Sequence, residues 1–193
     1  MTITELKLLL AALPEGQPLL FELLAHTGLR IGEAIELRWG RDLILDDPPA
    51  HPTALAMGRR TRVRAQDAYG KRDIPLSPGL KRKLLDARPP HADGRLVFST
   101  STGGRLNRHN LYRDVLGPTK RAVGLDWVTP HTFRHTCASL LFAPREHGGG
   151  GKNVKQVQEW LGHHSAAYTL KEYVHLIDTG VGEAAFLDDA TAA

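Results

Sequence analysis

Strand periodicity is confined to one stretch of this 193-residue chain, between residues 53 and 76. Within it, Thr61–Gln66 and Lys71–Leu76 flank a turn signal at residues 67–70, a pattern that predicts a β-hairpin. The rest of the chain carries helix start and stop signals. The sequence therefore predicts an α+β fold, mainly α-helical with one small antiparallel β-sheet.

Capping residues place the expected helices. Thr2 and Glu5 form a capping-box pattern before an apolar run, which predicts a helix over residues 3–12. Pro18 suits the first turn of a second helix, and Gly28 suits a left-handed residue that ends it. Four consecutive glycines at 148–151 predict a flexible loop. Ser77 and Asn153 suit the N-caps of helices over residues 78–87 and 154–161. Further helices are expected over residues 30–37, 107–122, 130–142 and 167–177.

Basic residues are concentrated in the middle of the chain. Residues 58–135 contain seventeen Lys and Arg against six Asp and Glu, whereas the segments on either side are net acidic. Such a distribution indicates a polyanionic partner, nucleic acid above all. The hairpin run also fits a solvated edge strand that its charge protects from aggregation. The candidate DNA contacts are Arg59, Arg60, Arg62, Arg64 and Arg72.

Several classes of protein are excluded. No apolar stretch is long enough to span a membrane, and the N-terminus lacks a secretory signal pattern, so we expect a cytoplasmic protein. Cys137, as the single cysteine, cannot form an internal disulfide bond. His131 and His135 have the spacing of two zinc ligands, but Thr132 stands where a glutamate base is needed and Arg134 would repel a cation. We expect no metal ion and no cofactor.

Two segments carry side chains suited to binding a phosphate. Thr129 and Pro130 predict a helix start, which places His131 and Arg134 on one face of its first turn. The unpaired N–H groups and the dipole of a helix start favour an anion there. Arg30 follows the helix-ending Gly28, although an arginine in such a place is more often an ordinary surface residue.

Two further residues complete the set of candidates. His163 directly follows Gly162, which is expected to end a helix and so to hold the imidazole at a defined corner. Tyr173 lies ten residues further on. Taken alone, a tyrosine of this kind is usually a half-buried core residue.

In this order the motifs resemble the tyrosine recombinase, or phage integrase, family. The resemblance covers Thr-Gly-Leu-Arg-x-Gly-Glu, a basic hairpin, His-x-x-Arg, Leu-Gly-His and a tyrosine, from about Leu6 to His175. It implies an enzyme that cleaves and rejoins DNA through a 3′-phosphotyrosine link without a metal ion. Arg30 and Arg134 would hold the scissile phosphate, His131 and His163 would donate hydrogen bonds or move protons, and Tyr173 would be the nucleophile.

One residue of the family pattern is missing. A catalytic lysine is expected in the hairpin near Gln66 and Asp67, where none stands. Lys71, across the predicted turn, is the only nearby candidate. Arg64 fits less well, because a guanidinium hardly releases its proton. If neither residue serves, the resemblance implies slow cleavage or none.

The resemblance also implies the organisation and partners of the protein. Residues 1–177 would form the catalytic domain alone, without the DNA-clamping domain that precedes it in the family, in a fragment or a natural truncation. The acidic tail at 178–193 would dock on a neighbouring subunit. The partners would be duplex DNA and further copies of the chain, with a tetramer on paired sites in a bacterial or phage nucleoid. A non-catalytic DNA-binding remnant and a type IB topoisomerase remain the alternatives.

Overall fold

The structure is a computed structural model that describes residues 1–45, 62–67 and 70–174, and in the hairpin the side chains of residues 63 and 72–75. Its order is helices α1 (Ile3–Ala12), α2 (Pro18–Thr27) and α3 (Ile31–Ala34); strands β1 (Leu43–Ile44), β2 (Arg62–Asp67) and β3 (Gly70–Pro75); helices α4 (Pro78–Asp86) and α5 (Arg108–Asn110); a π-helix η1 (Leu111–Leu116); helices α6 (Gly117–Ala122) and α7 (Pro130–Phe142); a 3-10 turn η2 (Arg145–His147); and helices α8 (Val154–Leu161) and α9 (Ala166–Tyr173).

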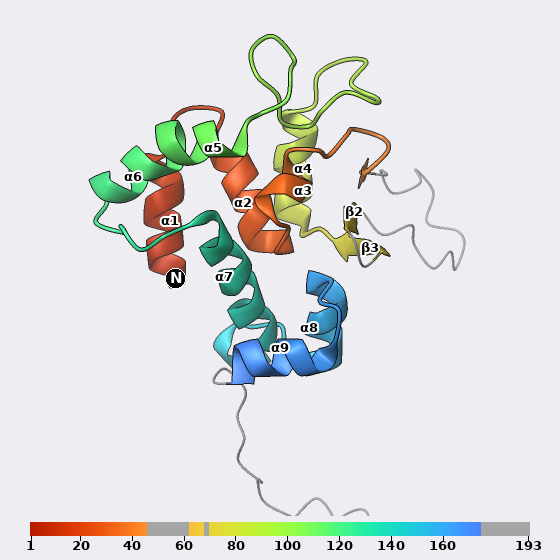
Figure 1. Ribbon diagram of the computed structural model, residues 1–193. Coiled ribbons are helices and arrows are strands. Elements are labelled where there is room, and N and C mark those ends of the chain that lie inside the picture. Colours follow the sequence, from red (N-terminus) through yellow and green to blue (C-terminus); the bar gives the residue numbers. More distant parts are fainter. Residues whose placement is uncertain (46–61, 68–69, 175–193) are drawn as a thin grey trace, which may run out of the picture.

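Helix α7 joins two hydrophobic clusters. Phe133 belongs to the larger cluster and lies 5.3 Å, between ring centroids, from Phe21 of α2. Further along α7, Cys137 and Leu141 belong to the smaller cluster, which α8 and α9 complete. In Figure 1, α7 accordingly runs from the group of α1, α2 and α6 towards α8 and α9. One helix therefore fixes the position of the α8–α9 pair relative to the main body.

The strands form one antiparallel sheet in the order β1-β2-β3. Val63 pairs with Ile74 on one side and with Leu43 on the other, and all three side chains are buried. The predicted hairpin is thus confirmed for the described residues, while β1 was not predicted. The predicted fold class, mainly helical with a small antiparallel sheet, is confirmed (Figure 1). Within the described ranges, no helix is long and apolar enough to cross a membrane.

Local capping signals mark most helix ends correctly. The Thr2 side chain accepts a hydrogen bond from the backbone N–H of Glu5, and Ser77 and Asn153 cap α4 and α8 in the same way. Gly28 and Gly162 end α2 and α8 with positive φ angles of 66° and 71°. These ends are confirmed because each depends on residues within one turn of the chain.

Two predicted helices differ from the structure. The helix expected over 30–37 ends at Ala34, because the next residues pair with a distant segment: the N–H of Trp39 donates to the carbonyl of Arg95, and that of Val97 to Leu37. The helix expected over 107–122 contains the wide turn η1. Pro118 just after it has no N–H to donate to the preceding turn, which accounts for the break in α-helical bonding.

The four-glycine loop is more ordered than its composition indicates. The N–H groups of Gly149, Gly150 and Gly151 donate to the carbonyls of Pro144, Leu140 and Ala143, at 2.8–2.9 Å. A Cβ on Gly149 would overlap the carbonyl group of Ala143. Glycine serves here to let the chain close against the end of α7, whereas the flexibility of this loop stays a prediction.

Candidate active site

Three predicted site residues line one pocket. The starts of α3, α5 and α7 surround a cavity of about 560 Å³ whose charged and ionisable lining residues are Arg30, Glu33, Arg108, His131 and Arg134. Arg30 precedes α3 directly, and His131 is the second residue of α7. The local fold therefore brings together two segments that are about a hundred residues apart in the sequence.

Arg134 is the most deeply anchored of these cations. Its side chain is 1% exposed, and Nη1 donates to the carbonyl of Gly28 at 2.6 Å while Nη2 donates to that of Leu161 at 2.7 Å. These carbonyls lie at the C-terminal ends of α2 and α8, where a positive charge is favoured. Burial, followed by the charges of Arg30 and Arg72, lowers the pKa of Arg134 to about 10, so it remains a cation at neutral pH.

Glu33 stabilises the start of α3. Its carboxylate accepts a hydrogen bond from the backbone N–H of Arg30 at 2.7 Å. The same carboxylate forms an ion pair with Arg72, whose Nη2 lies 3.0 Å from Oε1. Arg72 of the hairpin thus balances the charge of Glu33, the acidic residue among those that line this pocket.

His163 and Tyr173 lie outside this pocket, at the α8–α9 end of α7. The Tyr173 side chain is 2% exposed, and its ring lies nearly parallel to that of His163, with centroids 6.1 Å apart. His163 Nδ1 lies 2.8 Å from the Thr169 hydroxyl. The two residues are therefore adjacent to each other, and the positive charge of Arg134 acts to lower the pKa of both.

The environment keeps both groups neutral at physiological pH. Burial, with the positive charges of Arg134 and Arg30 next, lowers the pKa of His163 to about 4. Burial raises the pKa of Tyr173 to about 12, although Arg134 opposes that shift. The resting site thus holds a neutral imidazole and a protonated phenol beside buried cations, which is a suitable starting point for an attack that requires proton removal.

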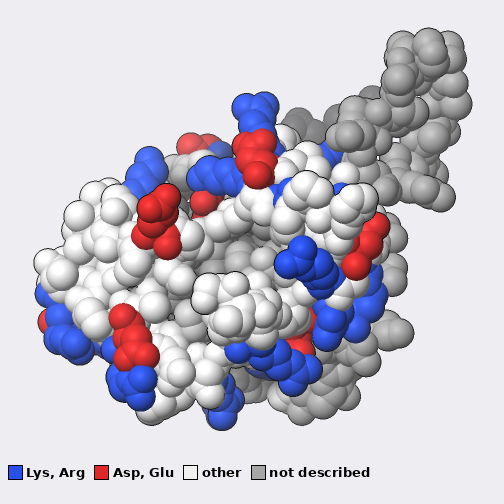
Figure 2. Space-filling view, turned by 90° about the horizontal axis from the view of Figure 1, so that it is seen from above, with Lys and Arg blue, Asp and Glu red and all other residues white. Residues whose placement is uncertain are grey.

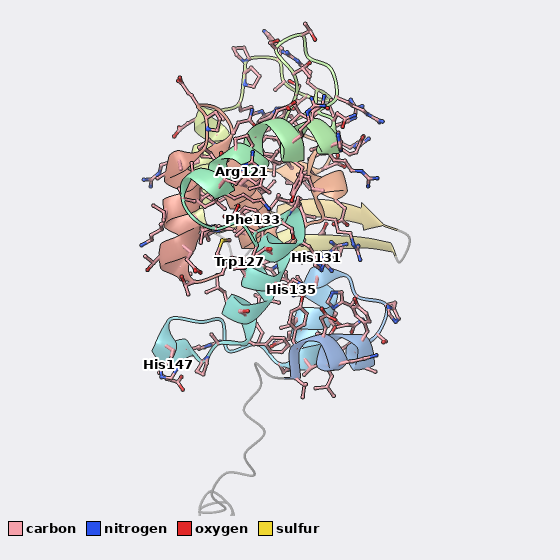
Figure 3. All side chains as sticks on the ribbon, turned by 60° about the vertical axis from the view of Figure 1, so that its left-hand side comes forward. Arg121, Trp127, His131, Phe133, His135 and His147 are labelled. Atoms are coloured by element: carbon pink, nitrogen blue, oxygen red, sulfur yellow. The ribbon has the colours of Figure 1, made fainter. Side chains whose placement is uncertain are left out.

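His135 is a neighbour of Tyr173 that the sequence reading considered only as a metal ligand. Its ring lies edge-on to the Tyr173 ring at 5.4 Å between centroids, and 4.5 Å from the ring of His131. Its Nε2 is 3.8 Å from a carboxylate oxygen of Glu172. Figure 3 shows His131 and His135 on successive turns of α7, on the side that faces the α8–α9 pair. His135 thus links the pocket residue His131 with the tyrosine.

Among the candidate DNA contacts at the hairpin, the structure describes the side chain of Arg72. Arg59 and Arg60 lie outside the described residues, as do the side chains of Arg62, Arg64 and the lysine candidate Lys71. Arg72 is described, and its side chain is only 10% exposed. Its guanidinium binds Glu33 and the carbonyl of Trp160. Arg72 thus lies in the interior, although the sequence named it as a candidate DNA contact.

Many cations of the basic middle segment are paired. Figure 2 shows Lys and Arg side chains in several separate groups, with acidic side chains beside many of them. The ion pairs of this segment include Lys83–Glu22, Arg88–Asp93, Arg105–Glu36 and Arg113–Asp114. Net charge alone therefore overstates the open basic surface.

Arg108 is a pocket residue that the sequence reading missed. It is exposed and makes no hydrogen bond or ion pair with any residue that the structure describes. Its only local signal is the N-cap Asn107, which accepts hydrogen bonds from the N–H groups of His109 and Asn110. A guanidinium that lines the same pocket as two other arginines is suited to an anion shared among them.

Comparison with known proteins identifies relatives over nearly the whole chain. The model of the phage integrase family matches residues 1–179. Tyrosine recombinase XerD of Corynebacterium glutamicum is 32% identical over 188 residues, which cover 91% of this chain and 56% of that protein. Tyrosine recombinase XerC of Mesorhizobium japonicum is 34% identical over 172 residues, covering 86% and 47%. The chain thus spans about half the length of these relatives.

Solved structures share the fold. The catalytic domain of bacteriophage HP1 integrase superimposes with a TM-score of 0.65 at 18% identity, covering 100% of this chain and 97% of that one. XerH recombinase in a post-cleavage complex with its palindromic difH substrate gives a TM-score of 0.64 at 21% identity, covering 98% of this chain and 51% of that one.

Proposed function

Because this chain belongs to the phage integrase family, we propose that it is a site-specific DNA strand transferase of the tyrosine recombinase type. The observation that carries the proposal is the pocket in which Arg30, His131 and Arg134 meet, with Tyr173 packed at the α8–α9 end of the same helix, beside His135. Residues 1–177 would form the catalytic domain. The substrate would be duplex DNA, in the place that the difH substrate takes in the complex of XerH.

The proposed reaction exchanges one phosphoester bond for another. The Tyr173 oxygen attacks the scissile phosphorus and loses its proton, while the bond from phosphorus to the 5′-oxygen breaks and that oxygen gains a proton. The products are a 3′-phosphotyrosine link and a free 5′-hydroxyl. In the reverse reaction, the 5′-hydroxyl of a partner strand attacks the phosphotyrosine, which joins the strands and releases Tyr173. Each step conserves the number of phosphoester bonds.

The other proposed catalytic residues would assist this reaction. Negative charge develops on the non-bridging oxygens in the transition state, and preorganised cations stabilise it. Arg30 and Arg134 would bind these oxygens, and neutral His131 and His163 would donate hydrogen bonds or take the tyrosine proton. Lys71 is the proposed proton donor to the leaving 5′-oxygen.

The test of the proposal is covalent trapping followed by peptide mapping. The protein is incubated with a pool of nicked duplexes whose cleaved 5′ fragment diffuses away, and a denaturing gel is used to find a protein–DNA band. After proteolysis, mass spectrometry is expected to find the nucleotide on Tyr173. An adduct on another residue would refute the assignment. Salt-sensitive binding without an adduct would favour the non-catalytic remnant, and relaxation of supercoils without a partner site would favour the topoisomerase.

We propose that Arg108 is a further contact to the phosphate backbone in this pocket. Replacing Arg108 by Ala is expected to weaken duplex binding by about tenfold and to reduce the slope of log Kd against log salt by about one. Binding is measured by fluorescence anisotropy at salt concentrations from about 50 to about 300 mM, because the affinity from phosphate contacts falls steeply over this range.

The matched control for Arg108 is Arg113→Ala. Arg113 is exposed on the same stretch, but Asp114 holds its guanidinium at 2.6 Å and it does not line the pocket. Its loss is expected to change Kd less than about twofold. A loss for Arg108→Ala that depends on the DNA sequence and leaves the salt slope unchanged would instead make Arg108 a base-reading residue.

We further propose that the protein assembles as a tetramer on paired DNA sites in the cytoplasm, at the nucleoid. Supporting this, an apolar pocket of about 600 Å³ between α1, α2 and α7 is lined also by Lys7 and by the ion pair of Lys83 with Glu22. The tail at 178–193 combines acidic residues with Val181, Phe186 and Leu187, so its chemistry matches such a pocket on a neighbouring copy.

A further inference from the structure

Arg72 occupies an unusual place for a basic residue on a β-hairpin. Its side chain is 10% exposed, and Nη2 lies 3.0 Å and 3.1 Å from the two carboxylate oxygens of Glu33. On the other side Nε donates to the carbonyl of Trp160 at 3.1 Å. A guanidinium buried in this way must be paired to be tolerated, and here it contacts two separate segments of the site.

The contact with Glu33 reaches Arg30. Glu33 is 9% exposed, and its carboxylate accepts the hydrogen bond of the backbone N–H of Arg30, which fixes the backbone of that residue. Without Arg72, this carboxylate would be a nearly buried anion in the wall of a pocket proposed to bind phosphate. Arg72 therefore orients Glu33 and also cancels a charge that would repel the substrate.

The contact with Trp160 reaches His163. Trp160 lies in the last turn of α8, two residues before Gly162, and a Cβ on Gly162 would lie 2.5 Å from Nη1 of Arg72. Glycine at this corner thus lets the backbone approach the guanidinium closely, directly before His163. The positive charge of Arg72 also contributes to the lowered pKa of His163.

We infer that Arg72 is a positioning residue that connects the β2–β3 hairpin to the two halves of the active site, the Arg30 helix start and the His163 corner. This inference rests on the proposed function. It assigns Arg72 an internal role in cleavage and no direct contact with DNA. The hairpin thereby contributes to catalysis through the contacts of Arg72 with α3 and α8.

The experiment compares Arg72→Ala, Arg72→Lys and the double variant Arg72→Ala/Glu33→Gln in single-turnover trapping at saturating protein. Arg72→Ala is expected to slow cleavage by about 100-fold, the effect of a small misplacement of reacting groups. The double variant is expected to recover at least about tenfold of that loss, since the unpaired anion is gone. Arg72→Lys, which keeps the charge but cannot span both partners, is expected to lie between them.

Binding measurements separate this role from a DNA contact. The Kd and its salt slope are expected to stay near wild type in Arg72→Ala. A salt slope reduced by about one would overturn the inference in favour of a phosphate contact. Wild-type cleavage by Arg72→Ala, or a double variant no faster than the single one, would overturn it as well. The control is Arg105→Ala, which removes an exposed arginine paired with Glu36 and is expected to change neither rate nor binding.

A readout without DNA keeps the inference testable if the proposed function fails. Histidine NMR titration of the free protein is expected to show a higher pKa for His163 in Arg72→Ala than in the wild type, because a nearby positive charge has been removed. Arg72→Lys, which retains the charge, serves here if Arg72→Ala does not fold, and is expected to leave that pKa closer to wild type. An unchanged pKa in Arg72→Ala, or a pKa in Arg72→Lys shifted far from wild type, would refute the link to the His163 corner.

Discussion

Replacing Tyr173 by Phe is expected to abolish the covalent protein–DNA band while leaving the fold intact. The ring packs against Cys137, Leu141 and Leu161, and phenylalanine retains all of these contacts. The hydroxyl has no hydrogen-bond partner among the residues that the structure describes, so its removal should change the free energy of unfolding by less than about 0.5 kcal/mol. Cleavage, in contrast, loses its nucleophile altogether. Denaturing gels measure the band, and gel shifts are expected to find binding within about twofold of wild type.

Tyr168→Phe is the matched control for this substitution. Tyr168 lies on the same helix, is 41% exposed, and its ring centroid is 5.0 Å from that of His163. Its variant is expected to keep the covalent band. If the band instead survives in Tyr173→Phe and disappears in Tyr168→Phe, Tyr168 is the nucleophile and the assignment of Tyr173 is wrong.

Replacing Arg134 by Ala is expected to remove both activity and a large part of the stability. The carbonyls of Gly28 and Leu161 would lose buried, charge-assisted hydrogen bonds, and a cavity would form between α2, α7 and α8. Relief of repulsion with Arg30 and Arg72 offsets part of this loss. We expect a destabilisation on the order of 3 kcal/mol and a fall in cleavage rate of at least about 1000-fold.

Urea unfolding and single-turnover cleavage measure the two effects separately. Arg134→Lys keeps the charge, but an ammonium cannot bind two carbonyls in the fork geometry of a guanidinium, so it is expected to recover only part of the stability. Cleavage at a near wild-type rate by Arg134→Ala would place the phosphate-binding cation elsewhere. An unchanged midpoint and slope of unfolding would show that the two carbonyl contacts contribute nothing.

The sequence predicted features that depend on neighbouring residues. Thr2, Ser77 and Asn153 cap their helices, and Gly28 and Gly162 end theirs, because a cap is decided within a few residues. The order of the motifs was enough to indicate the family. The positions of Arg30, His131 and Arg134 around one pocket agree with the roles proposed from those motifs.

Features that depend on distant contacts were not predictable. Arg134 is anchored by carbonyls 106 and 27 residues away, and Arg72 by a carbonyl 88 residues away, and no local pattern encodes such partners. In the sequence Arg72 is a candidate DNA contact, although its packing against α3 and α8 leaves its side chain only 10% exposed. Arg108 became a candidate only when the fold brought the start of α5 beside the starts of α3 and α7.

Most of the proposed active-site side chains are carried by the ends of helices. Arg30 precedes α3, Arg108 opens α5, His131 lies in the first turn of α7, and Tyr173 is the last residue of α9. Terminal turns open locally at a much lower free energy than the centres of packed helices. Arg30, Arg108 and His131 can therefore adjust to a substrate through fraying of single turns, whereas Tyr173, which is 2% exposed in the smaller hydrophobic cluster, and Arg134, which binds two carbonyls, stay anchored in the interior.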